Sequence, residues 1–116
     1  SAAALAVARR LQAARTAFEQ AVVFIAGRTK SDPNAAFAGS VPYMMLAGNL
    51  VAGWQMARAL IAAEDRLAAC EDEAFMTAKI ATARFYAEHI LPRAPGLRDA
   101  VVEGAASVTA LALDAF

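Results

Sequence analysis

Apolar residues recur every three or four positions along most of the chain, which is the spacing that lines one face of an α-helix. The first stretch with this pattern runs from about Ala2 to Thr29, and the turn-forming run from Lys30 to Asn34 ends it. We expect a loop of about ten residues to follow. The apolar face of this first predicted helix consists of Ala4, Val7, Leu11, Ala14, Phe18, Ala21 or Val22, and Ile25.

The second predicted helix extends from Ser40 to Leu67 or Ala68. Ser40 is a favourable N-cap residue, and Pro42 suits the first turn because its missing N–H has no helical partner there. Two glycines within this helix lower its propensity but allow a neighbouring helix to approach closely. Trp54, the only tryptophan of the chain, is expected to anchor its packing.

The third predicted helix lies between the turn around Cys70 and Pro92. Asp72 is the expected cap, and the acidic residues around it favour a helix start, since the helix dipole attracts negative charge there. Pro92 ends the helix because the residue before a proline is pushed out of the α region. A shorter periodic segment from Leu97 to Leu111 follows, with Gly104 placed to bend or divide it.

The composition agrees with a helical fold. Hydrophobic residues make up 59% of the 116 positions, which argues against disorder. Alanine is the commonest residue, and glycine and proline are few, so we expect helices that pack closely through small side chains. The sequence therefore predicts one all-α domain over residues 1–116, an up-down helical bundle of three long helices plus a shorter C-terminal helix.

The formal net charge is zero, with 11 basic and 11 acidic side chains, which disfavours nucleic-acid binding. The longest uncharged run, from Pro33 to Ala57, is a poor transmembrane segment, because its helical part is shorter than the roughly 20 residues that a bilayer requires. The first predicted helix is nevertheless basic, with Arg9, Arg10 and Arg15 beside its apolar face. A membrane-surface or partner-binding helical module that uses this helix is therefore an alternative function.

The chain shows no signature of catalysis or metal binding. A phosphate-binding glycine loop, a nucleophile elbow and an HExxH pair are all missing, and one cysteine and one histidine fall short of a zinc site. Glu88 directly precedes His89, so the Glu-x-x-His spacing of a di-iron bundle is missing too. We predict no catalytic, cofactor-binding or metal-ligating residue. Cys70 cannot form an intramolecular disulfide, which fits a reducing compartment and a cytoplasmic protein.

Polar residues interrupt the apolar side of the third predicted helix, on an arc that a bundle helix should bury. A buried lysine or histidine must find a partner or lose its charge, so these side chains belong either to an internal polar network or to an interface. A small-ligand site would need three of them to converge on one pocket. The ordinary structural explanation is a lysine reaching the rim and a tyrosine with its hydroxyl in water. The candidate residues are Lys79, Thr82, Tyr86 and His89.

The same segment carries a family resemblance. From Ala78 to Pro92 the sequence AKIATARFYAEHILP resembles the signature of a C-terminal domain found in one branch of the acyl-CoA dehydrogenase family, the acetyl-CoA dehydrogenase C-terminal-like domain. The block from Val41 to Ala59 is similar to a second part of that domain, and Gly104 to Phe116 looks like the end of the parent polypeptide. The first predicted helix matches only in pattern.

The resemblance implies a parent flavoenzyme that removes two hydrogens across the α and β carbons of an acyl-CoA thioester and passes the electrons from FAD to an acceptor. The flavin, the thioester pocket and the catalytic carboxylate would lie in upstream domains. This chain would then be no enzyme by itself but an accessory domain, excised from the C-terminus of the parent, that packs on the catalytic core or on a neighbouring subunit. Homodimer formation stays open.

Overall fold

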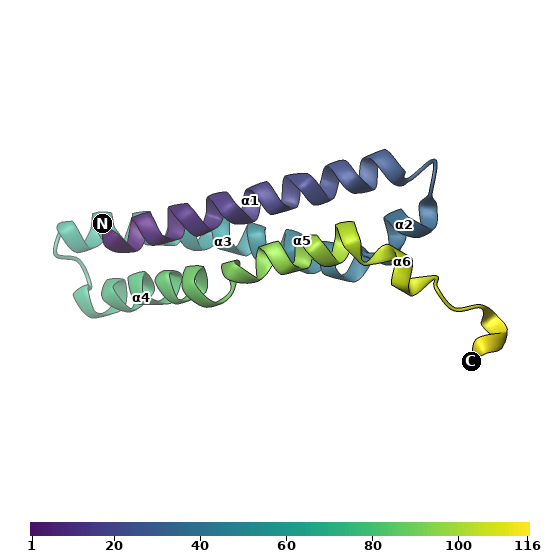
Figure 1. Cartoon of the computed structure of the whole chain (residues 1–116). Helices are drawn as coiled ribbons and strands as arrows, with labels where there is room; N and C mark the ends of the chain where they lie inside the picture. Colours follow the sequence, from purple (N-terminus) through teal and green to yellow (C-terminus); the bar gives the residue numbers. More distant parts are fainter.

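A computed structural model describes all 116 residues, and it contains helices without strands. The molecule is elongated, with principal extents of 66 × 28 × 17 Å (Figure 1). The predicted all-α class is therefore confirmed. The helices are α1 (Ala2–Arg28), α2 (Pro33–Ala38), α3 (Ser40–Ala68), α4 (Glu73–His89), α5 (Ala94–Glu103) and α6 (Ala105–Val108), with 3₁₀ helices η1 (Leu91–Arg93) and η2 (Leu113–Ala115).

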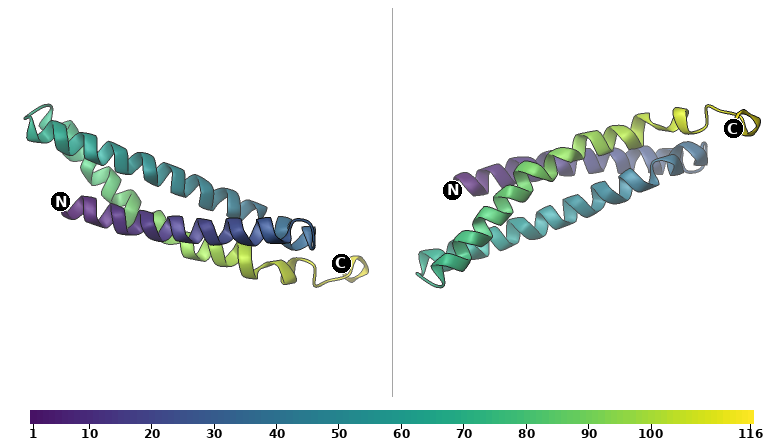
Figure 2. Two further views of the ribbon diagram at one scale, coloured as in Figure 1. Left: turned by 90° about the horizontal axis from the view of Figure 1, so that it is seen from above. Right: turned by 90° about the horizontal axis from the view of Figure 1, so that it is seen from below.

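Three rods lie side by side along the long axis. α1 and α3 run in opposite directions, and α4 returns alongside both, as predicted for an up-down bundle (Figure 1). The shorter helix α5 does not reverse direction. It continues the course of α4 after the 3₁₀ turn η1, so that α4 and α5 together form the third rod and both pack against α1 and α3 (Figure 2).

The core is built mainly from alanines, which lets the rods approach closely. One close contact lies at Gly53 of α3, where an added Cβ would stand 2.8 Å from Cδ2 of Leu91 and 3.3 Å from Cδ1 of Leu11. The Leu91 side chain thus occupies the space that the missing Gly53 side chain leaves. The buried core cluster comprises Ala3, Val7, Ala14, Ala17, Ala21, Leu46, Leu60, Ala83, Ala87, Leu91, Ala94 and Val101.

The connection between the first two long helices is not the simple loop that was predicted. The Asp32 carboxylate accepts a hydrogen bond from the Ala35 N–H (3.2 Å), and Pro33 occupies the first turn, so the segment forms helix α2. Burial of Ala35 and Ala36 holds this short helix against the bundle. The predicted role of Ser40 as an N-cap is wrong, since its hydroxyl donates to the Phe37 carbonyl (2.7 Å) inside the preceding turn.

The other predicted helix ends are largely confirmed. Asp72 precedes α4 at the cap position, although its side chain makes no capping hydrogen bond because the residue adopts a left-handed conformation (φ 41°). α4 ends before Pro92, which lies in η1, and Gly104 separates α5 from α6. Pro95 lies in the first turn of α5, where a proline is well tolerated. The final residues run beyond the end of the bundle.

Candidate interaction surface

Helix α4 has two distinct sides. Met76, Ala83 and Ala87 are buried, with Ile80 beside them, and they face the core. The other side borders α3 and is largely exposed; Phe75 and Phe85 keep 52% and 58% of their surface accessible. Scattered exposed apolar residues are normal, but large rings gathered on one helix face form a patch that marks an interaction site. We call this side the α4 outer face and define it as Phe75, Lys79, Thr82, Phe85, Tyr86 and His89.

Contacts within α4 hold several of these side chains in place. The Lys79 ammonium lies 5.2 Å from the centre of the Phe75 ring, one helical turn away. The His89 and Phe85 rings are stacked with centroids 4.4 Å apart. The Thr82 hydroxyl donates to the Ala78 carbonyl at 2.8 Å. The outer face therefore presents two aromatic pairs near its two ends, each formed within α4.

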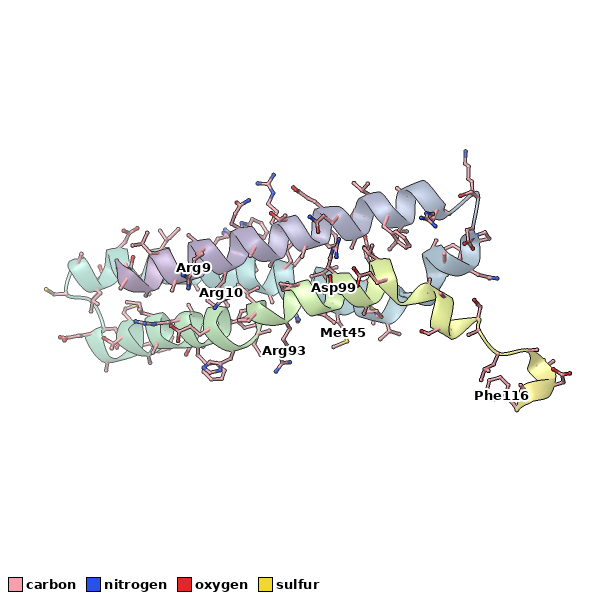
Figure 3. All side chains as sticks on the ribbon, in the orientation of Figure 1. Arg9, Arg10, Met45, Arg93, Asp99 and Phe116 are labelled. Atoms are coloured by element: carbon pink, nitrogen blue, oxygen red, sulfur yellow. The ribbon has the colours of Figure 1, made fainter.

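Tyr86 is the only member of the outer face that reaches another helix through a hydrogen bond. Its hydroxyl donates to the Asn49 carbonyl of α3 at 3.0 Å. Burial raises the pKa of Tyr86, and the positive charge of Arg93 acts in the opposite direction. In Figure 3, Arg93 and Met45 point to the side of the molecule away from α1. Tyr86 thus fastens α4 to α3 at the border of the outer face.

No hydrogen bond joins the four candidate residues to one another. Lys79, Thr82 and His89 are exposed, Tyr86 is half-buried, and each side chain has a partner outside the set. The sequence predicted one broad apolar arc on this helix, but α1 and α3 cover only part of that arc. The sequence also did not single out Phe75 and Phe85. Their spacing of four residues from Lys79 and His89 is the signal that could have done so.

None of the larger grooves brings the candidate residues together. A shallow groove of about 290 Å³ between α3 and α4 includes Phe75 and Lys79 but neither Tyr86 nor His89. Its charged residues are Arg66 and Lys79, so the groove is basic. A small-ligand site that needs Lys79, Tyr86 and His89 around one cavity is therefore not built. Histidine, cysteine, aspartate and glutamate side chains nowhere gather in a group of three that could hold a metal ion.

The residues present do not fit an FAD molecule. The largest groove, about 510 Å³ between α1 and α3, is lined mainly by apolar side chains. Its charged residue is Arg15, and the Arg15 guanidinium already donates to Glu19 at 2.9 Å. A dinucleotide needs several donors for its two phosphates, and such donors normally come from backbone N–H groups of a glycine-rich turn. This groove offers neither.

The basic first helix does not favour the membrane-surface alternative. Val7, Ala14 and Ala21, which the sequence assigned to its apolar face, are buried in the bundle core. Binding to a lipid surface requires that apolar face to be free. None of the helices combines the length and the apolar character needed to cross a membrane.

Charge on the opposite side of α4 is neutralised locally. Arg84 Nε lies 2.8 Å from Glu88 Oε1, one turn further along the helix. This hydrogen bond lowers the pKa of Glu88, and the charge of Arg10 on α1 acts in the same direction. Arg66 and Lys79 on the α3–α4 surface form no ion pair, in contrast to Arg84 on the α1 side of α4.

Taken as a class, the fold is a small all-α bundle domain with an exposed aromatic and basic helix face. Comparison with known families places it more closely: residues 1–112 match the model of the family described as acetyl-CoA dehydrogenase C-terminal like. The chain belongs to this family and is a C-terminal domain of an acyl-CoA dehydrogenase family protein. The match includes α1, which the sequence motifs alone had linked to the family only in pattern.

One curated relative is 3-methylmercaptopropionyl-CoA dehydrogenase from Ruegeria pomeroyi. It is 47% identical over 90 residues, which cover 78% of this chain and 15% of the relative. The chain thus corresponds to a small part of that protein. No solved structure matches the chain.

Proposed function

We propose that this chain is an accessory, non-catalytic domain that packs through the α4 outer face on the catalytic core, or on a neighbouring subunit, of an FAD-dependent acyl-CoA dehydrogenase. The observation that carries the proposal is the half-exposed state of Phe75 and Phe85 on a helix that buries Met76, Ala83 and Ala87. Covering these rings releases water from a large apolar area, which is the usual driving force of association.

The geometry of the outer face supports this assignment. The stacked pair Phe85–His89 and the pair Phe75–Lys79 form within α4 without a partner, and side chains that already pack together lose less freedom on binding. Arg66 and Lys79 give the adjoining groove a positive charge, and the partner surface is therefore expected to supply carboxylates. Aromatic and basic residues are also the types that most often dominate binding energy at interfaces.

The chemistry of the parent enzyme belongs to its other domains. The family assignment implies FAD as the cofactor of the parent and an acyl-CoA thioester as its substrate. The name of the Ruegeria pomeroyi relative makes 3-methylmercaptopropionyl-CoA the first substrate to assay in the full-length parent. We place the parent in the cytoplasm, where the exposed thiol of Cys70 stays reduced.

His89, the only histidine of the chain, offers a direct test. Diethyl pyrocarbonate is applied to the isolated chain and to the full-length parent, and the modified peptide is quantified by mass spectrometry. The exposed His89 of the isolated chain reacts quickly. In the parent we expect the reaction to slow by roughly tenfold or more, because a residue at the centre of an interface is screened from solvent.

A pair of variants completes the test. Phe85→Ala removes a ring from the outer face, and Thr77→Ala removes a side chain of α4 that is exposed but lies outside that face. Phe85→Ala should restore fast modification of His89 and weaken subunit assembly or flavin retention in the parent, whereas Thr77→Ala should leave all three unchanged. Equal modification rates of His89 in the isolated chain and in the parent would disprove the assignment of this face.

A further inference from the structure

The end of α1, the short helix α2 and the junction of α5 with α6 meet at one end of the bundle, away from α4 (Figure 1). A cavity of about 340 Å³ lies between these segments, and we call it the end cavity. Ligand pockets usually measure roughly 300–1,000 Å³, so the end cavity has the size of a site for a small molecule. Its lining includes Phe24, Arg28, Asp32, Asn34, Val102 and Glu103.

Three charged side chains line the end cavity, and they do not pair across it. Arg28 comes from the end of α1, Asp32 from the turn before α2, and Glu103 from the end of α5. The Arg28 guanidinium forms no ion pair, although carboxylates line two other parts of the cavity. It lies instead 5.2 Å from the centre of the Phe24 ring on the same helix. The donors of Arg28 are therefore free to meet a ligand.

Both carboxylates keep oxygens that can accept further hydrogen bonds. Asp32 accepts the Ala35 N–H at its Oδ1 (3.2 Å), and its second oxygen has no hydrogen-bond partner. Glu103 lies 3.7 Å from Arg98, which is beyond hydrogen-bonding distance. The end cavity thus offers a cationic donor on one side and two anionic acceptors on others. A single molecule can use all three only if it carries both an anionic and a cationic group.

We propose that the end cavity binds a small zwitterion, a molecule with a carboxylate and an ammonium group on a short carbon chain. Its carboxylate would accept hydrogen bonds from Arg28, whose planar guanidinium suits a carboxylate. Its ammonium would donate to Asp32 and Glu103. A simple anion would be repelled by the two carboxylates, and a simple cation would be repelled by Arg28. The end cavity shares no residue with the α4 outer face, so this proposal is independent of the proposed function.

Heteronuclear NMR of the isotope-labelled 116-residue chain tests this binding residue by residue. The probes are glycine, β-alanine and γ-aminobutyrate, three zwitterions whose charged groups lie progressively further apart. Butyrate and butylamine are the matched ligands that carry a single charge. We expect at least one zwitterion to shift the Arg28 Nε–H signal and the Asn34 side-chain amide signal together, in a saturable way. It should bind roughly tenfold more tightly than either single-charge ligand, because hydrogen bonds to charged groups are the stronger kind.

Three variants separate the contributions of the two charges. Arg28→Met should weaken binding of the zwitterion by roughly tenfold and remove its advantage over butylamine. Glu103→Gln should weaken binding of the zwitterion and reduce its advantage over butyrate, since one of the two carboxylates remains. Lys30→Met is the control, because Lys30 is an exposed basic residue close to Arg28 that does not line the end cavity. It should bind the zwitterion as the unmodified chain does.

Other outcomes overturn the proposal. If none of the three zwitterions gave saturable shifts, or if butyrate or butylamine bound equally well, the end cavity would not select a zwitterion. Shifts that spare Arg28 and Asn34, or that Arg28→Met leaves unchanged, would place the binding elsewhere on the chain. These results would not bear on the α4 outer face, whose test measures the accessibility of His89 in the parent.

Discussion

Gly53 lies against Leu91, so we expect the effect of Gly53→Ala on the free energy of unfolding to depend on whether Leu91 is present. Gly53→Ala places a methyl group 2.8 Å from Cδ2 of Leu91, closer than side chains normally approach. Overpacking of this kind costs about 1–3 kcal/mol, while alanine gains about 1 kcal/mol over glycine in helix propensity. We therefore expect Gly53→Ala alone to lower the free energy of unfolding by about 0–2 kcal/mol.

Removing Leu91 reverses this effect. Leu91 is 2% exposed, and Leu91→Ala should cost about 2–5 kcal/mol because it leaves a cavity under α3. In that background the new methyl group at position 53 no longer meets Leu91, keeps only the contact of 3.3 Å with Cδ1 of Leu11, and fills part of the cavity. The double variant should then be more stable than Leu91→Ala by up to about 1 kcal/mol, since the closest clash that opposed the gain in helix propensity is gone.

Urea unfolding followed by circular dichroism at the helix band measures all four species, and the difference between the two Gly53→Ala effects is the coupling energy. Gly48→Ala is the matched control, because no atom lies within 4 Å of the position its Cβ would take. It should raise stability by about 1 kcal/mol in either background. If Gly53→Ala had the same effect with and without Leu91, the close approach would not limit the packing at this site.

Three further predictions concern single side chains. Tyr86→Phe should cost about 0.5–1.5 kcal/mol at neutral pH by urea unfolding, because the hydrogen bond to Asn49 is lost. Burial raises the pKa of Tyr86 in the folded chain, so this advantage holds below the unfolded pKa near 10 and declines as the pH rises through the folded value; a gap that stayed constant up to pH 11 would contradict this. Asp32→Ala should cost about 1 kcal/mol and speed amide hydrogen exchange within α2, because the N-cap is lost. Ala14→Leu, at a fully buried position, should cost about 1–3 kcal/mol, whereas Ala13→Leu at the exposed neighbour should change stability little.

Local signals in the sequence were sufficient for the number and course of the long helices. Pro92 and Gly104 end or divide helices through their own backbone chemistry, wherever the segment lies in the molecule. Helix α2 was missed because its six residues are too few to show a period, and its formation depends on the burial of Ala35 and Ala36 against the bundle. Ser40 was misassigned because the preceding short helix had already satisfied its hydroxyl.

By itself, the sequence determined an all-α bundle and its family, since helix period, alanine content and the motif from Ala78 to Pro92 are properties of neighbouring residues. Only the tertiary structure decided which apolar residues form the core. Helix α4 has apolar side chains on both sides, and no local rule ranks Phe75 and Phe85 below Met76. The alanines let α1 and α3 come close to one side of α4, and that contact buried Met76 and left the two aromatic rings in solvent.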